Sequence, residues 1–248
     1  MERKVALVTG SSKGIGKGII IEFAKLGYDV VINYNHSFDE AYSLKEFVEK
    51  EYNVNTLVVQ CDVSLEEEVI DMVKDVISEF GHIDVLVNNA AIEECSEFKD
   101  KDKKSFERII GTNLIGSFLV SREVSKYMLE RKTGRIINIS SNNSINKFDP
   151  STLEYDCSKA GINILTKNMA KEFAPYINVN AVAPGWVLTE KNEELDKSLN
   201  GCFVSSESEN ILLKRFARVD EIAKVVLFLA SDDASYINGE VIVVDGGC

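Results

Sequence analysis

A tyrosine and a lysine four residues apart, Tyr155 and Lys159, are the side chains of this sequence best suited to proton transfer. Residues at this spacing are neighbours on one face of a helix, so a phenol would lie beside an ammonium group. A phenol ordinarily titrates at about pH 10, but a nearby positive charge favours the phenolate and lowers its pKa. The pair therefore predicts a general acid or base. On an arbitrary helix, however, the same spacing is more often two solvated surface residues.

A glycine-rich turn directly follows the first apolar run of the chain. Val5–Val8 is a predicted strand, and the turn Thr9–Gly16 (TGSSKGIG) leads into a predicted helix. Glycines allow backbone amides at a helix N-terminus to approach a pyrophosphate, because no Cβ atom stands in the way. The turn therefore predicts a dinucleotide site, and a glycine-rich turn without a ligand is the alternative.

The second predicted strand lacks the acidic residue that commonly binds the ribose 2′-hydroxyl of NAD. It is followed by Asn33, Tyr34 and Asn35, and the first carboxylate comes only at Asp39. A 2′-phosphate would be repelled by such an acid and is tolerated without it. Lys13, in the glycine-rich turn, could supply a compensating positive charge, although a solvated surface lysine is the alternative. We therefore expect NADP as the cofactor and favour NADPH, with NAD as the alternative.

Seven short apolar runs alternate with longer helical segments along the chain. Short continuous runs indicate strands buried on both faces, and their alternation with helices predicts right-handed crossovers. We expect an α/β fold with a doubly wound parallel sheet flanked by helices on both faces, in a single domain over residues 1–248. The predicted strands are Val5–Val8, Val30–Ile32, Thr56–Val59, Ile83–Val87, Arg135–Ile139, Ile177–Ala183 and Val241–Val244. The predicted helices cover residues 14–27, 39–52, 65–80, 103–131, 153–174 and 219–230.

Residues 188–212 interrupt this alternation. The segment follows Pro184-Gly185, is polar and rich in glutamate and serine, and carries few strong structural signals. Long irregular segments in compact domains are often functional. We therefore predict a substrate lid here, with a mobile surface insertion as the alternative.

Several more residues surround the Tyr155–Lys159 pair in a consistent order along the chain. They are Thr9–Gly16, Asn88–Ala91 (NNAA), Asn113, Ser141, Pro184-Gly185 and Thr189. In these motifs, and over essentially its whole length, the sequence resembles the short-chain dehydrogenase/reductase family. The resemblance implies a Rossmann-type fold and the NAD(P)-dependent interconversion of a ketone and a secondary alcohol by hydride transfer.

The same resemblance assigns roles to four residues. Tyr155 donates a proton to the carbonyl oxygen during reduction, and Ser141 hydrogen-bonds the developing oxyanion. Lys159 tunes Tyr155 and holds the nicotinamide ribose, while Asn113 supports a water chain that resupplies the proton. The cofactor-binding residues that it implies are Gly10, Ser12, Lys13, Gly14, Ile15, Gly16, Asn35, Asp62, Val63, Asn89, Ala90, Tyr155, Lys159, Pro184, Gly185, Val187 and Thr189.

The sequence departs from the family's pattern at two places. Ser141 lies 14 residues before Tyr155, one more than family members commonly have, so the loop between them carries an extra residue. Ser140 is then a competing catalytic serine, and Ser144 is a weaker one. Ala91 replaces a glycine beside the cofactor cleft. We expect the longer loop to alter the substrate pocket more than the chemistry. Asp62, which the resemblance assigns to the cofactor site, could alternatively be a solvated residue beside a helix cap.

The composition argues against several other classes of protein. The formal net charge of −12 repels nucleic-acid phosphates, and no basic stripe offsets it. No stretch approaches the roughly 20 apolar residues of a membrane-spanning helix. The five scattered cysteines never form a CxxC motif, and neither His36 nor His82 has a second ligand at metal spacing. We expect reduced thiols, no metal, no signal peptide, and a cytoplasmic protein without nucleic-acid or membrane partners.

The expected partner is a small ketone or alcohol substrate. Among the family's branches, the sequence resembles the 3-oxoacyl-carrier-protein reductases and glucose-dehydrogenase-like proteins, so a 3-oxoacyl compound is the leading expectation. The first branch docks an acidic carrier protein through basic residues, but residues 173–176 lack the arginine it typically places there. A hydroxysteroid or a sugar is the alternative. The alternative of a different class is a non-catalytic NADP(H)-binding regulator. The resemblance also implies a homo-oligomer, a dimer or tetramer paired through helices 103–131 and 153–174.

Overall fold

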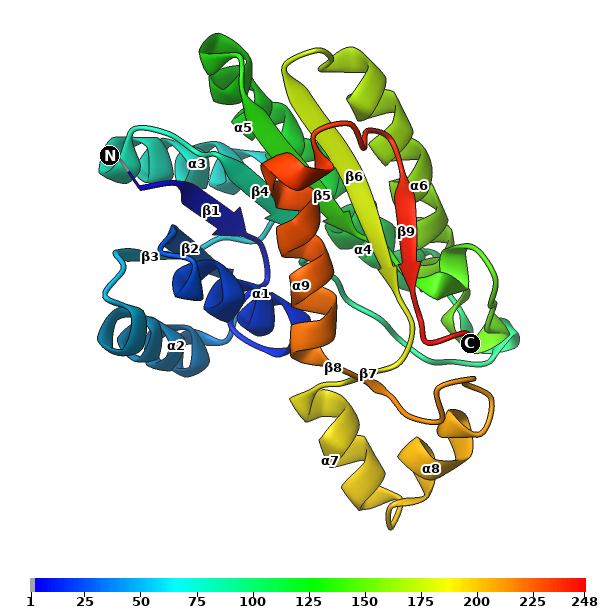
Figure 1. The fold of residues 1–248 in the computed structure, drawn as a ribbon. Coiled ribbons are helices and arrows are strands. Elements are labelled where there is room, and N and C mark those ends of the chain that lie inside the picture. The colour runs from blue at the N-terminus through cyan, green and yellow to red at the C-terminus, as the bar shows by residue number, and fades with distance from the viewer. Residues whose placement is uncertain (1–2) are drawn as a thin grey trace.

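The computed structural model describes residues 3–248 and contains one parallel sheet of seven strands, in the order β3-β2-β1-β4-β5-β6-β9 (Figure 1). The predicted doubly wound α/β fold is confirmed. The strands are β1 (Val5–Val8), β2 (Asp29–Tyr34), β3 (Thr56–Gln60), β4 (Val85–Asn88), β5 (Gly134–Ile139), β6 (Ile177–Pro184) and β9 (Val241–Val244).

Helices cover both faces of the sheet, which explains why the strands are continuous apolar runs. One face packs against Phe23 and Val226, and the opposite face packs against Val76 and Met128; all four side chains are buried. The helices of the first face are α1 (Gly14–Lys25), α2 (Phe38–Tyr52) and α9 (Val219–Ala230). Those of the second face are α3 (Glu66–Phe80), α5 (Gly116–Arg131) and α6 (Leu153–Glu172).

The order of the strands reverses between β1 and β4. From β1 the chain moves outward to β2 and β3, and it then returns to place β4 on the other side of β1. Val8 pairs with Val87, so the carboxyl ends of both strands meet at the same edge of the sheet. In open α/β sheets, ligands bind in the crevice outside the strand ends at such a reversal. The glycine-rich turn and the loop after β4 both begin there.

The helix predicted over residues 103–131 is interrupted, and that prediction was wrong in detail. Helix α4 (Lys103–Ile110) is followed by a π-helical turn (Gly111–Ile115), after which α5 begins at Gly116. A Cβ atom on Gly116 would lie 2.8 Å from Cγ2 of Val63, so the backbones approach closely here. Single π turns occur frequently at functional sites. This one contains Asn113, one of the predicted catalytic residues.

The predicted lid, residues 188–212, is more regular than its sequence suggested. It contains two short helices, α7 (Glu190–Ser198) and α8 (Cys202–Ser208), which extend beyond the carboxyl ends of the strands (Figure 1). Thr189 caps α7, because its Oγ1 accepts a hydrogen bond from the Asn192 amide at 3.4 Å. The segment is closed at its base by a two-stranded parallel pairing of β7 (Val187–Leu188) with β8 (Ala217–Arg218). No helix among residues 3–248 is long and apolar enough to span a membrane.

At Gly10 the glycine-rich turn closely approaches the backbone of the loop after β4. Its φ is +58°, and a Cβ atom would lie 2.8 Å from Cα of Ala90. Gly27 has a comparable φ of +80°, but nothing lies within 4 Å of the position its Cβ would take. Gly27 is therefore a control for backbone conformation without the close contact.

We expect Gly10→Ala to destabilise the protein more than Gly27→Ala. Both changes place an L-residue in the left-handed region, which costs about 1–2 kcal/mol. Gly10→Ala adds overpacking against Ala90, which typically costs about 1–3 kcal/mol. Urea denaturation of the two variants at one protein concentration measures the difference. Equal losses would contradict the close packing of the turn on the loop after β4.

Candidate active site

Tyr155 and Lys159 lie in the first turns of α6, as their spacing predicts. Nζ of Lys159 is 5.5 Å from the centre of the Tyr155 ring. The helix begins after a 3₁₀ turn (Pro150–Thr152), and its first turn contains Glu154 and Asp156. Acidic residues are favourable at this end because they face the positive end of the helix dipole. The structure therefore brings the predicted proton donor and its lysine together.

Lys159 is buried, and its ammonium group is held by the end of β5. Nζ donates a hydrogen bond to the carbonyl oxygen of Ile139 at 2.7 Å. Burial lowers the pKa of Lys159 to about 8, while the negative charge of Glu93 opposes this shift. At neutral pH the side chain therefore still carries its proton.

The phenol of Tyr155 has a pKa above its usual value. Burial is the main cause, the charge of Glu93 raises the pKa further, and a hydrogen bond with Ser141 acts in the opposite direction. The spacing in the sequence indicated only the effect of the Lys159 ammonium, because burial and the approach of Glu93 arise from the folded chain. The phenol is therefore protonated at neutral pH, which suits a residue that donates a proton.

Of the candidate serines, Ser141 is the one that contacts Tyr155. Its Oγ also accepts a hydrogen bond from the Asn143 amide at 3.2 Å, which fixes the 3₁₀ turn Asn142–Ser144 after β5. Ser140 is buried, and its Oγ donates to Oδ1 of Asn163 at 2.7 Å. The hydroxyl of Ser144 also bonds to Asn163, at 2.9 Å. Ser140 and Ser144 thus hold the turn against α6.

Asn113 links the π-helical turn to two other parts of the site. Its side chain makes paired hydrogen bonds with the backbone of Ile92, at 2.8 and 2.9 Å, and donates to Oγ of Ser158 at 3.0 Å. The residue is fully buried. These contacts anchor the loop after β4 to α6. The position of Asn113 is therefore fixed by hydrogen bonds to residues that are distant in the sequence.

The glycine-rich turn is fastened to the loop after β4 by reciprocal hydrogen bonds. Oγ1 of Thr9 accepts from the amides of Asn89 and Ala90, both at 3.0 Å. The amide group of Asn89 donates to the carbonyl oxygens of Thr9 and Gly10, both at 2.9 Å. A Cβ atom on Gly16 would lie 2.5 Å from this amide nitrogen. Asn89 thus holds the turn in shape at the start of α1.

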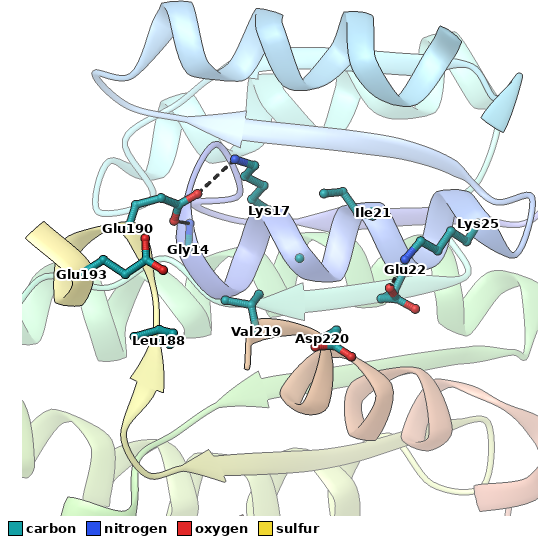
Figure 2. Close-up of a pocket in the computed structure, with 11 residues that line it drawn as sticks. Gly14, Lys17, Ile21, Glu22, Lys25, Leu188, Glu190, Glu193, Val219 and Asp220 are labelled. Carbon is teal, nitrogen blue, oxygen red and sulfur yellow. Dashed lines mark hydrogen bonds and ion pairs between the residues drawn. The ribbon is translucent and has the colours of Figure 1, made fainter. Parts of the chain in front are cut away.

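An anion already lies at that N-terminus. The amide of Gly14 donates to the carboxylate of Glu190 at 3.1 Å, and Lys17 pairs with the same carboxylate at 3.0 Å (Figure 2). Partial burial would raise the pKa of Glu190, but these hydrogen bonds and the backbone of Glu190 itself keep it below the usual value. The turn is therefore suited to bind a phosphate, which at this amide would have to displace Glu190.

Three of the predicted cofactor-binding residues, Lys13, Asn35 and Asp62, have partners within the protein. Lys13 forms an ion pair with Glu40 of α2 at 2.7 Å, so its charge is not free for a 2′-phosphate in this structure. Nδ2 of Asn35 donates to Asp62 at 3.0 Å, which joins the ends of β2 and β3. The other predicted residues lie at the same carboxyl edge: Ser12, Ile15, Val63, Pro184, Gly185, Val187 and Thr189.

The comparisons with known proteins agree with this geometry. The family model described as enoyl-(acyl carrier protein) reductase matches residues 10–248. This chain belongs to the short-chain dehydrogenase/reductase family. The 3-oxoacyl-[acyl-carrier-protein] reductase FabG of Staphylococcus epidermidis is 40% identical over 245 residues, which cover 98% of each chain. FabG of Staphylococcus aureus is 39% identical over 98% of this chain and 97% of its own.

Two solved structures of short-chain dehydrogenase/reductase folds are also similar to this chain. ElxO with NADP bound has a TM-score of 0.92 at 33% identity, covering 99% of this chain and 98% of its own. A putative short-chain dehydrogenase/reductase from Burkholderia xenovorans has a TM-score of 0.89 at 30% identity, covering 100% and 98%. The predicted family and the predicted class, an NAD(P)-dependent oxidoreductase, are confirmed.

Glu93 and Glu190 are the residues of the site that sequence reasoning missed. Glu93 also pairs with Lys191 of α7 at 3.2 Å, so it lies between the Tyr155–Lys159 pair and the predicted lid. The sequence does contain one signal for Glu190, an acidic residue directly after Thr189. Residues 93–98 were expected to border the substrate pocket, but the effect of the Glu93 charge on Tyr155 and Lys159 was not predicted, because it depends on contacts between distant segments.

We expect Glu93→Gln to lower the pKa of Lys159 below its value of about 8. The carboxylate stabilises the ammonium, so its removal favours loss of the proton. Titration of ¹³Cε-labelled lysine by NMR measures the shift, and Lys159→Met assigns the signal. Glu97→Gln, at an exposed position of the same loop, is the control. An unchanged titration of Lys159 in Glu93→Gln would show that the two groups do not interact.

Proposed function

We propose that the protein uses NADPH to reduce a ketone to a secondary alcohol, with a 3-oxoacyl thioester as the leading substrate. The observation that carries this proposal is the contact of Tyr155 with both Ser141 and Lys159 at the carboxyl edge of the sheet. The FabG relatives bear the name of 3-oxoacyl reductases over nearly the full chain. For NADPH, the support is the absence of a carboxylate at the end of β2 and the NADP in ElxO.

In the proposed reaction, the protonated phenol of Tyr155 donates its proton to the substrate's carbonyl oxygen. The hydroxyl of Ser141 hydrogen-bonds the same oxygen and stabilises the negative charge that develops on it. Bound NADPH supplies the hydride. Lys159 holds a positive charge beside the phenol and stabilises the phenolate left after proton transfer. Asn113 holds the loop after β4 against α6, the helix that carries Tyr155 and Lys159.

A neutral hydroxylated ketone, such as a sugar or a steroid, is the second candidate substrate. The carboxylate of Glu93 near Tyr155 would repel a negatively charged group close to the reacting carbonyl. The net charge of −12 would likewise repel an acidic carrier protein. Both observations favour an uncharged substrate over one attached to such a carrier.

The test is turnover of NADPH with a panel of ketones: an acetoacetyl thioester, a ketosteroid and a ketose. We expect loss of absorbance at 340 nm with at least one of them. Tyr155→Phe should lower kcat by about 10²–10⁴-fold, the usual contribution of a positioned acid, while NADPH still binds. Tyr236→Phe, at a fully exposed tyrosine, is the control. NADPH binding without oxidation by any ketone would favour the non-catalytic regulator instead.

We further propose that two or more copies associate through α5 and α6. Phe118 is 43% exposed and lines a groove between these helices together with Leu165 and Met169. Ile164, on α6, is 61% exposed. An apolar face of this kind is buried when a second copy packs against it.

Phe118→Glu should therefore reduce the molar mass in solution, because it places a charge in the proposed interface. Phe47→Glu, at a phenylalanine of α2 that is 44% exposed, should leave the mass unchanged. Light scattering coupled to gel filtration measures both. A wild-type protein with the mass of one chain would refute the association.

We place the reaction in the cytoplasm. Cys95, Cys157 and Cys202 are exposed and unpaired among the described residues, as suits a compartment that keeps thiols reduced. The proposed partner is the small ketone itself.

A further inference from the structure

Tyr155 lies between two carboxylates, Glu154 and Asp156, that have no part in the proposed chemistry. Each of them is bound to a different loop beside the active site. Glu154 contacts the segment after β4, residues 92–101, and Asp156 contacts the loop between Ser141 and α6. The single helical turn that carries the phenol is therefore attached to two loops that come from different strands.

Glu154 forms a buried ion pair with Lys101. Their charged atoms are 2.6 Å apart, and the side chains are only 2% and 8% exposed. Nζ of Lys101 also donates to the carbonyl oxygen of Ser151 at 2.8 Å, and the amide of Ser96 donates to the same carbonyl at 3.1 Å. A buried pair gains little stability over apolar side chains of similar size, because both charges lose their hydration. Its contribution here is to fix the geometry of residues 92–101, the segment that contains Glu93.

Asp156 fastens the longer loop at both of its ends. Its Oδ1 accepts from Nδ2 of Asn143 at 2.9 Å and from Oγ1 of Thr152 at 3.2 Å, and its Oδ2 accepts from the amide of Asp149 at 2.9 Å. The amide of Asn143 in turn donates to Oγ of Ser141. A chain of contacts thus runs from Asp156 through Asn143 to the hydroxyl that hydrogen-bonds Tyr155.

We infer that Glu154 and Asp156 are positioning residues that set the two walls of the substrate pocket relative to the Tyr155 phenol. Asp156 keeps Ser141 within reach of the phenol although the loop contains an extra residue. Glu154, through Lys101, holds the wall that contains Glu93. The inference rests on the proposed roles of Tyr155 and Ser141.

Two variants of Asp156 and one control variant test the role of this residue. Asp156→Ala removes the charge and all three accepted hydrogen bonds, whereas Asp156→Asn removes the charge but keeps an oxygen for Asn143 and Thr152. Glu172→Ala, at the other end of α6, is the control. A displacement of reacting groups by about 1 Å lowers rates by about 100-fold. We expect a loss of kcat/KM of that size in Asp156→Ala and substantial recovery in Asp156→Asn, with NADPH affinity unchanged in both.

A spectroscopic measurement keeps this test independent of turnover. The ¹³Cζ chemical shift of Tyr155 at neutral pH reports the hydrogen bond from Ser141, and Ser141→Ala gives the value without that bond. We expect Asp156→Ala to move the signal toward the Ser141→Ala value, and Asp156→Asn to stay near wild type. If the signal of Asp156→Ala matches wild type, the inference fails whatever the activity. Absence of turnover in the wild type alone would instead refute the proposed function.

The ion pair is tested by replacing both partners, because removal of one leaves an unpaired buried charge that can prevent folding. In the double variant Lys101→Met/Glu154→Leu, apolar side chains fill the same space, but the hydrogen bonds from Nζ of Lys101 to Ser151 and Ser96 are lost. We expect a folded protein whose KM for the ketone rises several-fold while kcat changes less, since the pocket wall is loosened and the phenol is not. An unchanged KM would overturn the role of the pair.

Discussion

The active site depends on one buried positive charge. The ammonium of Lys159 lies away from water, between the end of β5 and the Tyr155 ring, where an unpaired charge would be very unfavourable. The Ile139 carbonyl, the face of the tyrosine ring and the negative charge of Glu93 together compensate for the lost hydration. These partners come from β5, from α6 and from the loop after β4. The site therefore forms only when the sheet has brought all three elements together.

Ion pairs around the site differ in burial. The pair Lys101–Glu154 is almost inaccessible to water, so breaking it would leave a buried charge unpaired. The pairs Lys17–Glu190, Lys191–Glu93 and Lys147–Glu207 tie the predicted lid to other segments, and their side chains are about one-third exposed or more. Exposed pairs contribute about 0–1 kcal/mol. The buried pair behind the predicted substrate pocket is therefore more costly to break than the pairs of the predicted lid.

The sequence was sufficient for the features that are local or periodic. Continuous apolar runs predicted the seven strands to within two residues at each end, and the spacing of Tyr155 and Lys159 predicted their proximity. The π turn at Gly111–Ile115 was not predictable, because Asn113 within it is held by Ile92 and Ser158, which lie far from it in the sequence. The partners of Lys13 and Gly14 were missed for the same reason, since Glu40 and Glu190 are near them only in the folded chain.

The segment between Ser141 and Tyr155 is anchored at both ends, by β5 and by α6. Ser141 follows directly from β5, and Tyr155 is fixed by α6, so both are positioned by the sheet and its helix. Between them the chain forms two short 3₁₀ turns, Asn142–Ser144 and Pro150–Thr152, and the intervening residues lie at the surface. A change in loop length is absorbed there at a small entropic cost. Such a change can therefore alter the loop without moving Tyr155, the proposed proton donor, provided that contacts such as those of Asp156 close the loop at its base.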